Sequence, residues 1–236
     1  MQTDPSLMTV RGSLDALVAP LVNHVLAHGD LIVGFAGPPG CGKTTLVSAV
    51  AAEIQCREST SRPLAVSLDD FYYSRAERDS KGIRFRAAPG SHDLDAATRL
   101  LADVRRGESR VDVPRFDHAT DDRRQAEIFA GPASVVLLEG LCVGLDTHGY
   151  AVIADQLDVL VYLDCPTSLS RERRFAREAA IRRESGGVHG FSAAETEAFW
   201  TEVLEPGIAH WIRPIRARAD IVVVLDAQGY VAGVEG

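Results

Sequence analysis

Short apolar runs alternate with predicted helices along most of the chain. The apolar runs lie at residues 31–36, 63–68, 134–138, 157–163 and 220–225, and runs of this length predict buried parallel strands. Helical segments are predicted at 13–29, 43–56, 94–106, 167–185 and 191–211. This alternation predicts an α/β fold, a three-layer α/β/α sandwich around a five-stranded parallel sheet.

Several segments break the alternation. Residues 74–91 lose the helical pattern and hold five basic residues, so we expect a long loop that is functional or mobile. Residues 111–113 predict a short edge strand, and residues 115–124 predict a second polar, charged loop. Residues 1–12 predict a frayed N-terminus, ahead of a single domain at 13–236.

The chain is acidic, with a formal net charge of −8 over 236 residues. A surface that follows nucleic acid or an anionic membrane needs a basic footprint, so this charge argues against both kinds of partner. The four cysteines are far apart and form no C-x-x-C pair, which favours reduced thiols in a cytoplasmic protein over a zinc site or a disulfide framework. The first residues carry no basic region and no long apolar run, so we expect no signal peptide and no membrane anchor.

A glycine-rich stretch follows the first apolar run and opens a predicted helix. It consists of Gly37, Pro38, Pro39, Gly40, Cys41, Gly42, Lys43, Thr44 and Thr45. Strand, glycine loop and helix in this order are typical of a phosphate-binding loop, where backbone N–H groups and the helix N-terminus hold a polyphosphate. Lys43 would bridge the β- and γ-phosphates from an exposed position, and the Thr44 hydroxyl would bind the Mg²⁺ that they share. We therefore expect ATP or GTP with Mg²⁺, in a fold of the P-loop containing nucleoside triphosphate hydrolase type.

Carboxylates follow two other predicted strands. Asp69 and Asp70 come directly after the run at 63–68, and in doubly wound sheets this end of a strand faces the ligand. Two interpretations stay open: the pair caps the next segment, or it supplies a general base and a ligand for magnesium or its water. Glu139 follows the run at 134–138, where the carboxylate of a phosphate-loop site holds magnesium or its water.

The helix that begins near residue 168 is rich in arginine. Five arginines lie between positions 171 and 182. Such a run is usually a solvated face whose charges pair at i,i+4. Guanidinium groups also suit a transferring phosphate, so residues 168–190 could form a lid over ATP with Arg173 and Arg177 as catalytic groups. The sequence leaves both interpretations open.

Several short motifs resemble a group of phosphate-loop kinases that includes uridine kinase, phosphoribulokinase and pantothenate kinase. Beside the glycine loop, these motifs lie at 67–72 and 138–140; further stretches at 90–94, 114–117, 179–182 and 190–195 most resemble the plant and fungal type of D-glycerate 3-kinase. The resemblance implies that Asp69 takes the proton from the acceptor hydroxyl. The loop after Pro114 is shorter than in that family. Ala87 stands where uridine kinases tend to carry an acidic residue, which disfavours uridine.

The expected acceptor pocket combines arginines, histidines, a tyrosine and an aspartate. Its members are Tyr72, Arg84, Arg86, His92, Arg115, Asp117, His118 and Arg123. Glycerate is a small anion, so at least one of these arginines should bind it. His118 either hydrogen-bonds the acceptor hydroxyl or caps its own loop, and His92 either contributes to the pocket or holds the shape of its loop.

Together these features predict an ATP-dependent kinase that phosphorylates a hydroxyl of a small metabolite, with D-glycerate as the first candidate. Pantothenate, a nucleoside or a sugar is the alternative acceptor. A second alternative is a P-loop ATPase or nucleotide switch with a protein partner, which would position water in place of an acceptor. The oligomeric state stays open, and a homodimer is among the states considered.

Overall fold

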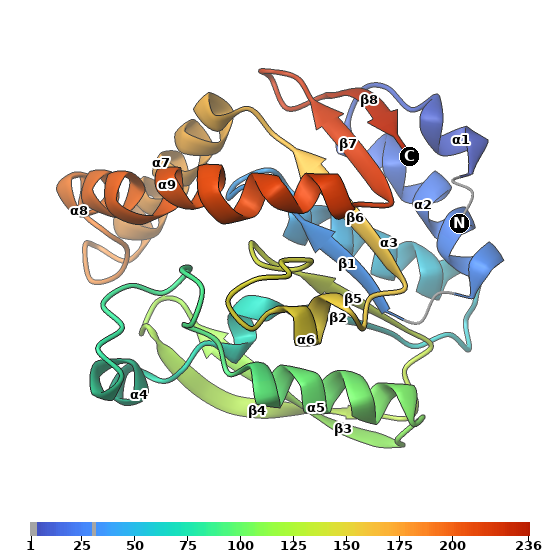
Figure 1. The fold of residues 1–236 in the computed structure, drawn as a ribbon, viewed down its shortest axis with the longest axis horizontal. Coiled ribbons are helices and arrows are strands. Elements are labelled where there is room, and N and C mark those ends of the chain that lie inside the picture. Colours follow the sequence, from blue (N-terminus) through green and yellow to red (C-terminus); the bar gives the residue numbers. More distant parts are fainter. Residues whose placement is uncertain (1–3, 30–31) are drawn as a thin grey trace.

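A six-stranded sheet forms the centre of the computed structural model, which describes residues 4–29 and 32–236 (Figure 1). In order across the sheet, the strands are β2 (Pro63–Ser67), β5 (Val135–Glu139), β1 (Ile32–Ala36), β6 (Val159–Asp164), β7 (Ile221–Leu225) and β8 (Val231–Glu235). The first five are parallel and β8 is antiparallel to β7, so the predicted parallel sheet is confirmed with one additional strand. Leu31, predicted to begin β1, lies outside the described residues.

Helices and single turns connect the strands. The α-helices are α1 (Pro5–Met8), α2 (Val18–His28), α3 (Lys43–Arg57), α4 (Arg75–Ser80), α5 (Leu94–Arg105), α6 (Ala151–Ala154), α7 (Thr167–Glu184), α8 (Ala193–Phe199) and α9 (Glu205–Gly207). Tight 3₁₀ turns lie at Leu14–Leu17, Leu68–Phe71 and Arg213–Arg218, and π-helical turns lie at Trp200–Leu204 and Ile208–Ile212. In the part of the chain that the structure describes, no helix is long and apolar enough to span a membrane.

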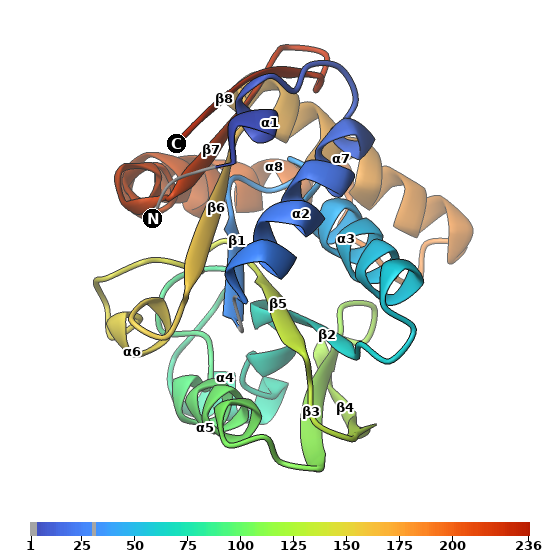
Figure 2. The same cartoon turned by 90° about the vertical axis from the view of Figure 1, so that its right-hand side faces the viewer.

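Helices cover both faces of the sheet, which explains why its strands read as continuous apolar runs. In β1, Val33 packs into the cluster formed with α2 and α3, whereas Ile32 points into the opposite cluster, which includes residues of α5 and α6. Figure 2 shows α2 and α3 on one side of the sheet and α6 on the other. This is the three-layer arrangement that the sequence predicts.

The register of the parallel strands gathers their ends at one edge. Phe35 of β1 lies opposite Glu139 of β5, and Ser67 of β2 lies opposite the same glutamate. The segments that follow β1, β2 and β5 therefore leave the sheet side by side. These segments carry the glycine loop, Asp69 and Gly140, so the sheet itself positions the candidate site.

An antiparallel hairpin and a short helix replace the two loops predicted on the acceptor side. The strands β3 (Arg110–Asp117) and β4 (Asp122–Ala130) form a separate sheet, so the loop predicted at 115–124 is wrong. β4 is exposed along most of its length and shows no apolar alternation from which a strand could be predicted. α4 lies within the segment predicted as a loop at 74–91, and it begins with a capping box formed by Ser74 and Glu77.

From α8 to Arg218 the chain forms a nearly continuous helical rod, which we call the helical arm (residues 193–218; orange to red in Figure 1). Pro206 and Pro214 each follow a π-helical turn within two residues. Proline lacks a backbone N–H and interrupts the α-helical ladder, so these turns have a local cause in the sequence. Buried Trp200 and Ile212 pack the arm on the face of the sheet opposite α2 and α3.

The N-terminal segment packs against the last strand instead of fraying. Leu7 of α1 is fully buried, Val10 is 8% exposed, and Gly12 pairs with Val231 of β8. The expectation of a frayed end is therefore wrong from Asp4 onward, because the free edge of β8 and its apolar neighbours give this segment a partner. Residues 1–3 lie outside the described residues.

Candidate active site

The glycine loop between β1 and α3 is shaped to hold phosphate. Gly37 and Gly42 have φ angles of 144° and 100°, which favour glycine. A Cβ at Gly37 would lie 2.5 Å from the Leu163 carbonyl oxygen, so close packing also requires glycine there. Because α3 begins at Lys43 directly after this loop, its unpaired N–H groups and the positive end of its dipole face the loop.

Lys43 lies inside the loop, in contrast to the exposed position that we expected. Its side chain is buried, and Nζ donates hydrogen bonds to the carbonyl oxygens of Gly37 and Pro38, at 2.9 Å each. The carbonyls satisfy the ammonium group, which explains how a charged side chain can be held at 7% exposure. Phosphate oxygens bound by the loop would compete for the same ammonium group.

Thr44 and Glu139 form an oxygen pair at the edge of the loop. The Thr44 hydroxyl donates to Glu139 Oε1 at 3.0 Å, and the Glu139 side chain is buried. Burial raises the pKa of Glu139, although the charge of Lys43 opposes this effect. A hydroxyl and a carboxylate are hard oxygen ligands of the kind that Mg²⁺ accepts beside phosphates and water, so these two residues fit a magnesium site.

Asp69 lies in the 3₁₀ turn after β2, between two histidines. Its Oδ1 is 3.8 Å from Nε2 of His92, and its Oδ2 is 3.8 Å from Nε2 of His118. Burial acts to raise the pKa of Asp69, but the contacts with both histidines and the Tyr72 hydroxyl outweigh burial, so the pKa lies well below its usual range. The Asp69 carboxylate is therefore ionised and partly open to the cavity described below.

Asp70 and Arg115 point away from the loop and tie the same turn to β3. The carboxylate of Asp70 accepts from Arg115 at 2.9 Å and from the Phe116 N–H at 3.1 Å. Arg115 also donates to Glu127 at 2.9 Å. With both carboxylate oxygens used in this way, Asp70 holds the turn in place, which corrects its prediction as a metal ligand. Arg115 is likewise removed from the acceptor pocket.

One cavity of about 280 Å³ brings most of the remaining predicted residues together. It lies between the glycine loop, the ends of β2 and β5, and α7. The predicted residues that line it are Pro39, Gly40, Gly42, Lys43, Thr44, Thr45, Asp69, Tyr72, Arg86, His118, Glu139, Arg173 and Arg177. Burial lowers the pKa of His118, aided by nearby arginines and opposed by Asp69, so its imidazole is held in the neutral form.

One face of α7 supplies the arginines of the cavity wall. Arg173 donates to the carbonyl oxygens of Gly40 at 3.1 Å and Gln228 at 3.3 Å, which ties α7 to the glycine loop. Arg174 forms a 2.6 Å ion pair with Glu178, and Arg177 is an exposed side chain that borders the cavity. Of the two interpretations of the arginine run, this placement supports the lid for these positions.

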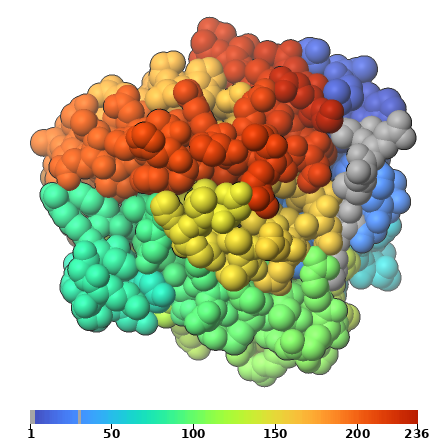
Figure 3. Space-filling view, in the orientation of Figure 1, coloured from blue at the N-terminus to red at the C-terminus, as the bar shows by residue number. Residues whose placement is uncertain are grey.

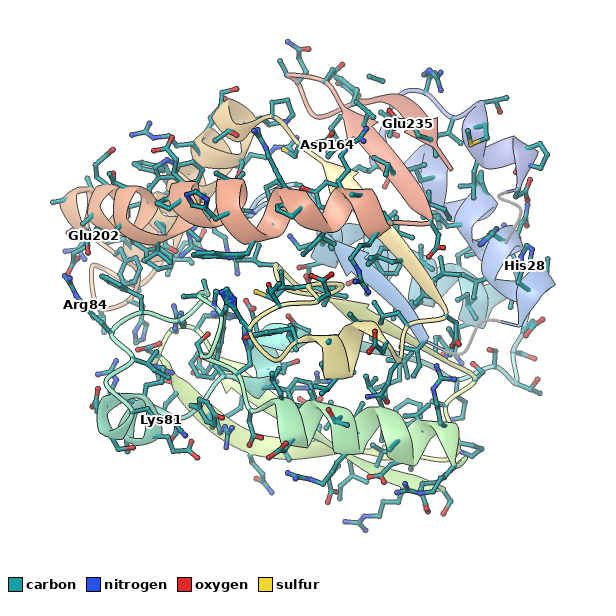
Figure 4. The ribbon with its side chains drawn as sticks, viewed as in Figure 1. His28, Lys81, Arg84, Asp164, Glu202 and Glu235 are labelled. Atoms are coloured by element: carbon teal, nitrogen blue, oxygen red, sulfur yellow. The ribbon has the colours of Figure 1, made fainter. Side chains whose placement is uncertain are left out.

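Besides Arg115, four residues predicted for the acceptor pocket lie outside the lining. Arg123 donates to the Tyr72 carbonyl at 2.8 Å and so braces the turn from behind. Asp117 accepts from the Ala119 N–H in its own hairpin turn. Arg84 forms an exposed ion pair with Glu202 of the helical arm, seen at the edge of the molecule in Figure 4. His92 is buried behind Asp69.

Comparison with known proteins agrees with this geometry. Residues 32–228 match the Phosphoribulokinase / Uridine kinase family. The chain belongs to this family. It is an ATP-dependent small-molecule kinase of the P-loop type.

The proteins that resemble this chain are named for different acceptors. A pantothenate kinase of Sorangium cellulosum is 31% identical over 213 residues, which cover 81% of this chain and 68% of the relative. A pantothenate kinase of Leifsonia xyli subsp. xyli is 28% identical and covers 86% of this chain and 68% of the relative. The solved D-glycerate 3-kinase of Cryptococcus neoformans var. grubii shares the fold with a TM-score of 0.78 at 18% identity, over 93% of this chain and 99% of that chain.

Leu141, Phe199 and Leu204 line this kinase's cavity and were not singled out from the sequence. Leu141 comes directly after Glu139 and Gly140 at the end of β5. Phe199 and Leu204 belong to the helical arm and reach the cavity only through tertiary packing. The lining is therefore completed by a part of the chain that carries no chemical motif.

Proposed function

We propose that this kinase transfers the γ-phosphate of ATP to a hydroxyl of a small hydroxy acid, with D-glycerate as the first candidate. The observation that carries the proposal is the position of Asp69. Its ionised carboxylate shares one cavity with the glycine loop and with Arg86, Arg174 and Arg177. A base, a phosphate cradle and several cations in one space suit the transfer of phosphate to an anionic acceptor.

Each group has a distinct task in this reaction. The loop N–H groups and Lys43 hold the β- and γ-phosphates, while Thr44 and Glu139 would hold Mg²⁺, which supplies charge neutralisation when bound. Asp69 orients the acceptor hydroxyl and receives its proton as the oxygen bonds to the γ-phosphorus and the bond to the ADP oxygen breaks. Arg177 stabilises the charge on the phosphoryl group in transit.

Arg86 is the best-placed group to recognise a carboxylate on the acceptor. Its side chain lines the cavity, and Nη1 pairs with Asp121, which also binds Arg78 and Arg75. This anchoring fixes the guanidinium, whose remaining N–H groups can bind a carboxylate in a forked geometry. D-glycerate and pantothenate both combine a carboxylate with a hydroxyl.

Pantothenate is the second candidate acceptor. The motifs at 90–94 and 114–117 and the fold shared with a D-glycerate 3-kinase support glycerate. The names of the relatives at 28–31% identity support pantothenate. Both acceptors depend on the same base and the same cation, so the chemistry proposed for the site holds for either.

The test is a coupled assay of ADP release with D-glycerate, pantothenate, uridine and common sugars, against an acceptor-free control. We expect release that depends on a hydroxy acid, and Arg86→Ala should raise the KM for that acid. Arg75→Ala is the matched control, because it removes another partner of Asp121 from an exposed position outside the cavity. ADP release at the same rate without any acceptor would instead support an ATPase or nucleotide switch.

A further inference from the structure

His92 is fixed directly behind the turn that carries Asp69. Its neighbours bond to that turn through the backbone: Tyr73 N–H donates to Ser91 O at 3.0 Å, and Asp93 N–H donates to Phe71 O at 2.8 Å. The imidazole stacks on the Tyr72 ring with centroids 4.3 Å apart. At 3% exposure, the His92 ring has little freedom to turn.

The hydroxyl of Tyr150 determines which nitrogen of His92 carries the proton. This hydroxyl lies 2.5 Å from His92 Nδ1, and it also accepts the Gly90 N–H at 3.3 Å. The Gly90 N–H is itself a donor, so among the described residues Nδ1 is the acceptor that the structure offers to the hydroxyl hydrogen. A neutral imidazole that accepts at Nδ1 carries its own hydrogen on Nε2.

That Nε2 hydrogen faces Asp69. Nε2 of His92 is buried and has no hydrogen-bond partner among the described residues, and Oδ1 of Asp69 is 3.8 Å away. The separation exceeds a normal hydrogen bond of about 2.7–3.2 Å. Contacts between catalytic groups commonly tighten when reactants bind. The other oxygen, Oδ2, faces His118, which lines the cavity.

We propose that His92 is a positioning residue that holds Oδ1 of Asp69 and so leaves Oδ2 to receive the acceptor proton, with Tyr150 fixing the tautomer required. The inference rests on the proposed function, because it takes Asp69 as the base. It extends that function to two residues, of which His92 is behind the cavity and Tyr150 comes from the segment after β5, far along the chain. Neither residue touches the reactants.

The test compares two amides at position 92. The Gln amide reaches the place of Nε2, whereas the shorter Asn amide reaches the place of Nδ1. His92→Gln should therefore keep most of kcat, while His92→Asn should lower kcat by about tenfold or more, as misplacement of a catalytic group does, with an unchanged KM for ATP. Tyr150→Phe keeps the aromatic ring but releases the tautomer, and it should lower kcat in the same way. Thermal unfolding is followed for all three proteins, and Tyr150→Phe decides the matter if His92→Asn does not fold.

A double substitution separates this inference from the proposed function. In the Asp69→Asn background, adding His92→Asn should lower the residual kcat no further, because the base that His92 positions is already lost. Equal kcat for His92→Gln and His92→Asn, wild-type kcat for Tyr150→Phe, or a further loss in the double variant would overturn the inference alone. Wild-type turnover by Asp69→Asn itself would show that Asp69 is not the base, and it would contradict the proposed function as well.

Discussion

At the scale of single residues, the charge of Asp69 governs what the site can do. Its lowered pKa keeps it ionised at neutral pH, ready to accept a proton. Asp69→Asn retains the size of the side chain but cannot take the proton. We expect phosphoryl transfer to fall by about 10²- to 10⁴-fold while ATP affinity persists. ATP binding and acceptor-dependent ADP release are measured on the same protein.

Asp70→Asn is the matched control for this substitution. Asp70 neighbours the base but bonds to Arg115 and the Phe116 N–H outside the cavity. We expect the effect of Asp70→Asn to be on stability, with transfer largely retained. If Asp69→Asn abolishes ATP binding, or if both variants lose the same activity, Asp69 is not the base.

Glu139 links catalysis to stability through its buried charge. Burial raises its pKa above the ordinary value of 4.5. A raised pKa in the folded state favours the protonated form, so the ionisation of Glu139 removes stability as pH rises from 4.5 through the folded-state pKa. Glutamine cannot ionise, yet its oxygen can still accept the Thr44 hydroxyl.

Glu139→Gln should therefore unfold at a higher temperature than the wild type at pH 7–8, in the presence of a chelator. The difference should shrink as pH falls toward 4.5. The same variant should lose kinase activity, because an amide is a poor substitute for a carboxylate that holds magnesium. A variant that is less stable than the wild type at pH 8 would show that the charge of Glu139 is stabilising.

The site residues that could be predicted from the sequence are those whose roles follow from their position directly after an apolar run. The glycine loop, Asp69 and Glu139 each follow directly on an apolar run, and the sheet brings such positions together. The arginines could not be sorted in this way. Arg84 and Arg115 are engaged by Glu202 and Asp70, which lie 118 and 45 positions away in sequence. Which cation remains free for a ligand is decided by such distant partners.

At the scale of elements, α7 carries some arginines that line the cavity and others that lie outside it. Arg177 borders the cavity, whereas Arg183 lines an apolar groove near the end of the helix. Arg177→Ala should lower kcat by about 10²-fold or more, as the loss of charge stabilisation in the transition state does. Arg183→Ala, the control on the same helix, should leave kcat unchanged. Wild-type kcat for Arg177→Ala would assign Arg177 to the solvated face of α7.

The elements that escaped prediction are those whose burial is slight or whose partner is distant in sequence. β4 is exposed along most of its length, and α4 has only six residues. β8 is stabilised by pairing with β7 and by contact with α1. Neither interaction leaves a pattern in the residues of β8 themselves. The buried parallel strands and long helices, in contrast, carry their own periodicity.

At the scale of the whole molecule, the cavity is lined from two sides, by Arg86 and Ala87 of the segment after α4 and by Phe199 and Leu204 of the helical arm. The segment after α4 meets the helical arm through the Arg84–Glu202 ion pair and the contact of Phe85 with Phe199. Figure 3 shows these two parts, teal and orange, in contact at one side of the molecule. The exposed ion pair contributes only about 0–1 kcal/mol, and the apolar cluster that includes Ala87 and Phe199 joins the two sides behind it. A ligand in the cavity would touch both sides and stabilise the folded state by its binding free energy.

Ligand binding should therefore raise the unfolding temperature in two steps. A non-hydrolysable ATP analogue with Mg²⁺, at about 100 times its Kd, adds about 2.7 kcal/mol, and for a chain of this size each kcal/mol shifts the unfolding temperature by about 2–4 °C. Lys43→Met should lack this shift, because it removes the buried ammonium that meets the phosphates. Asp69→Asn should retain it.

The acceptor should then add its own shift only when the nucleotide analogue is present, since Asp69, Arg86 and the glycine loop border one cavity. D-glycerate and pantothenate are compared at equal concentration, with uridine as a control that lacks a carboxylate. A second shift with either acid, lost in Arg86→Ala and kept in Arg75→Ala, identifies the acceptor class by binding alone. If MgATP raises the unfolding temperature but neither acid raises it further, the site binds nucleotide without a hydroxy acid. A nucleotide switch with a protein partner then becomes the better account of the same fold.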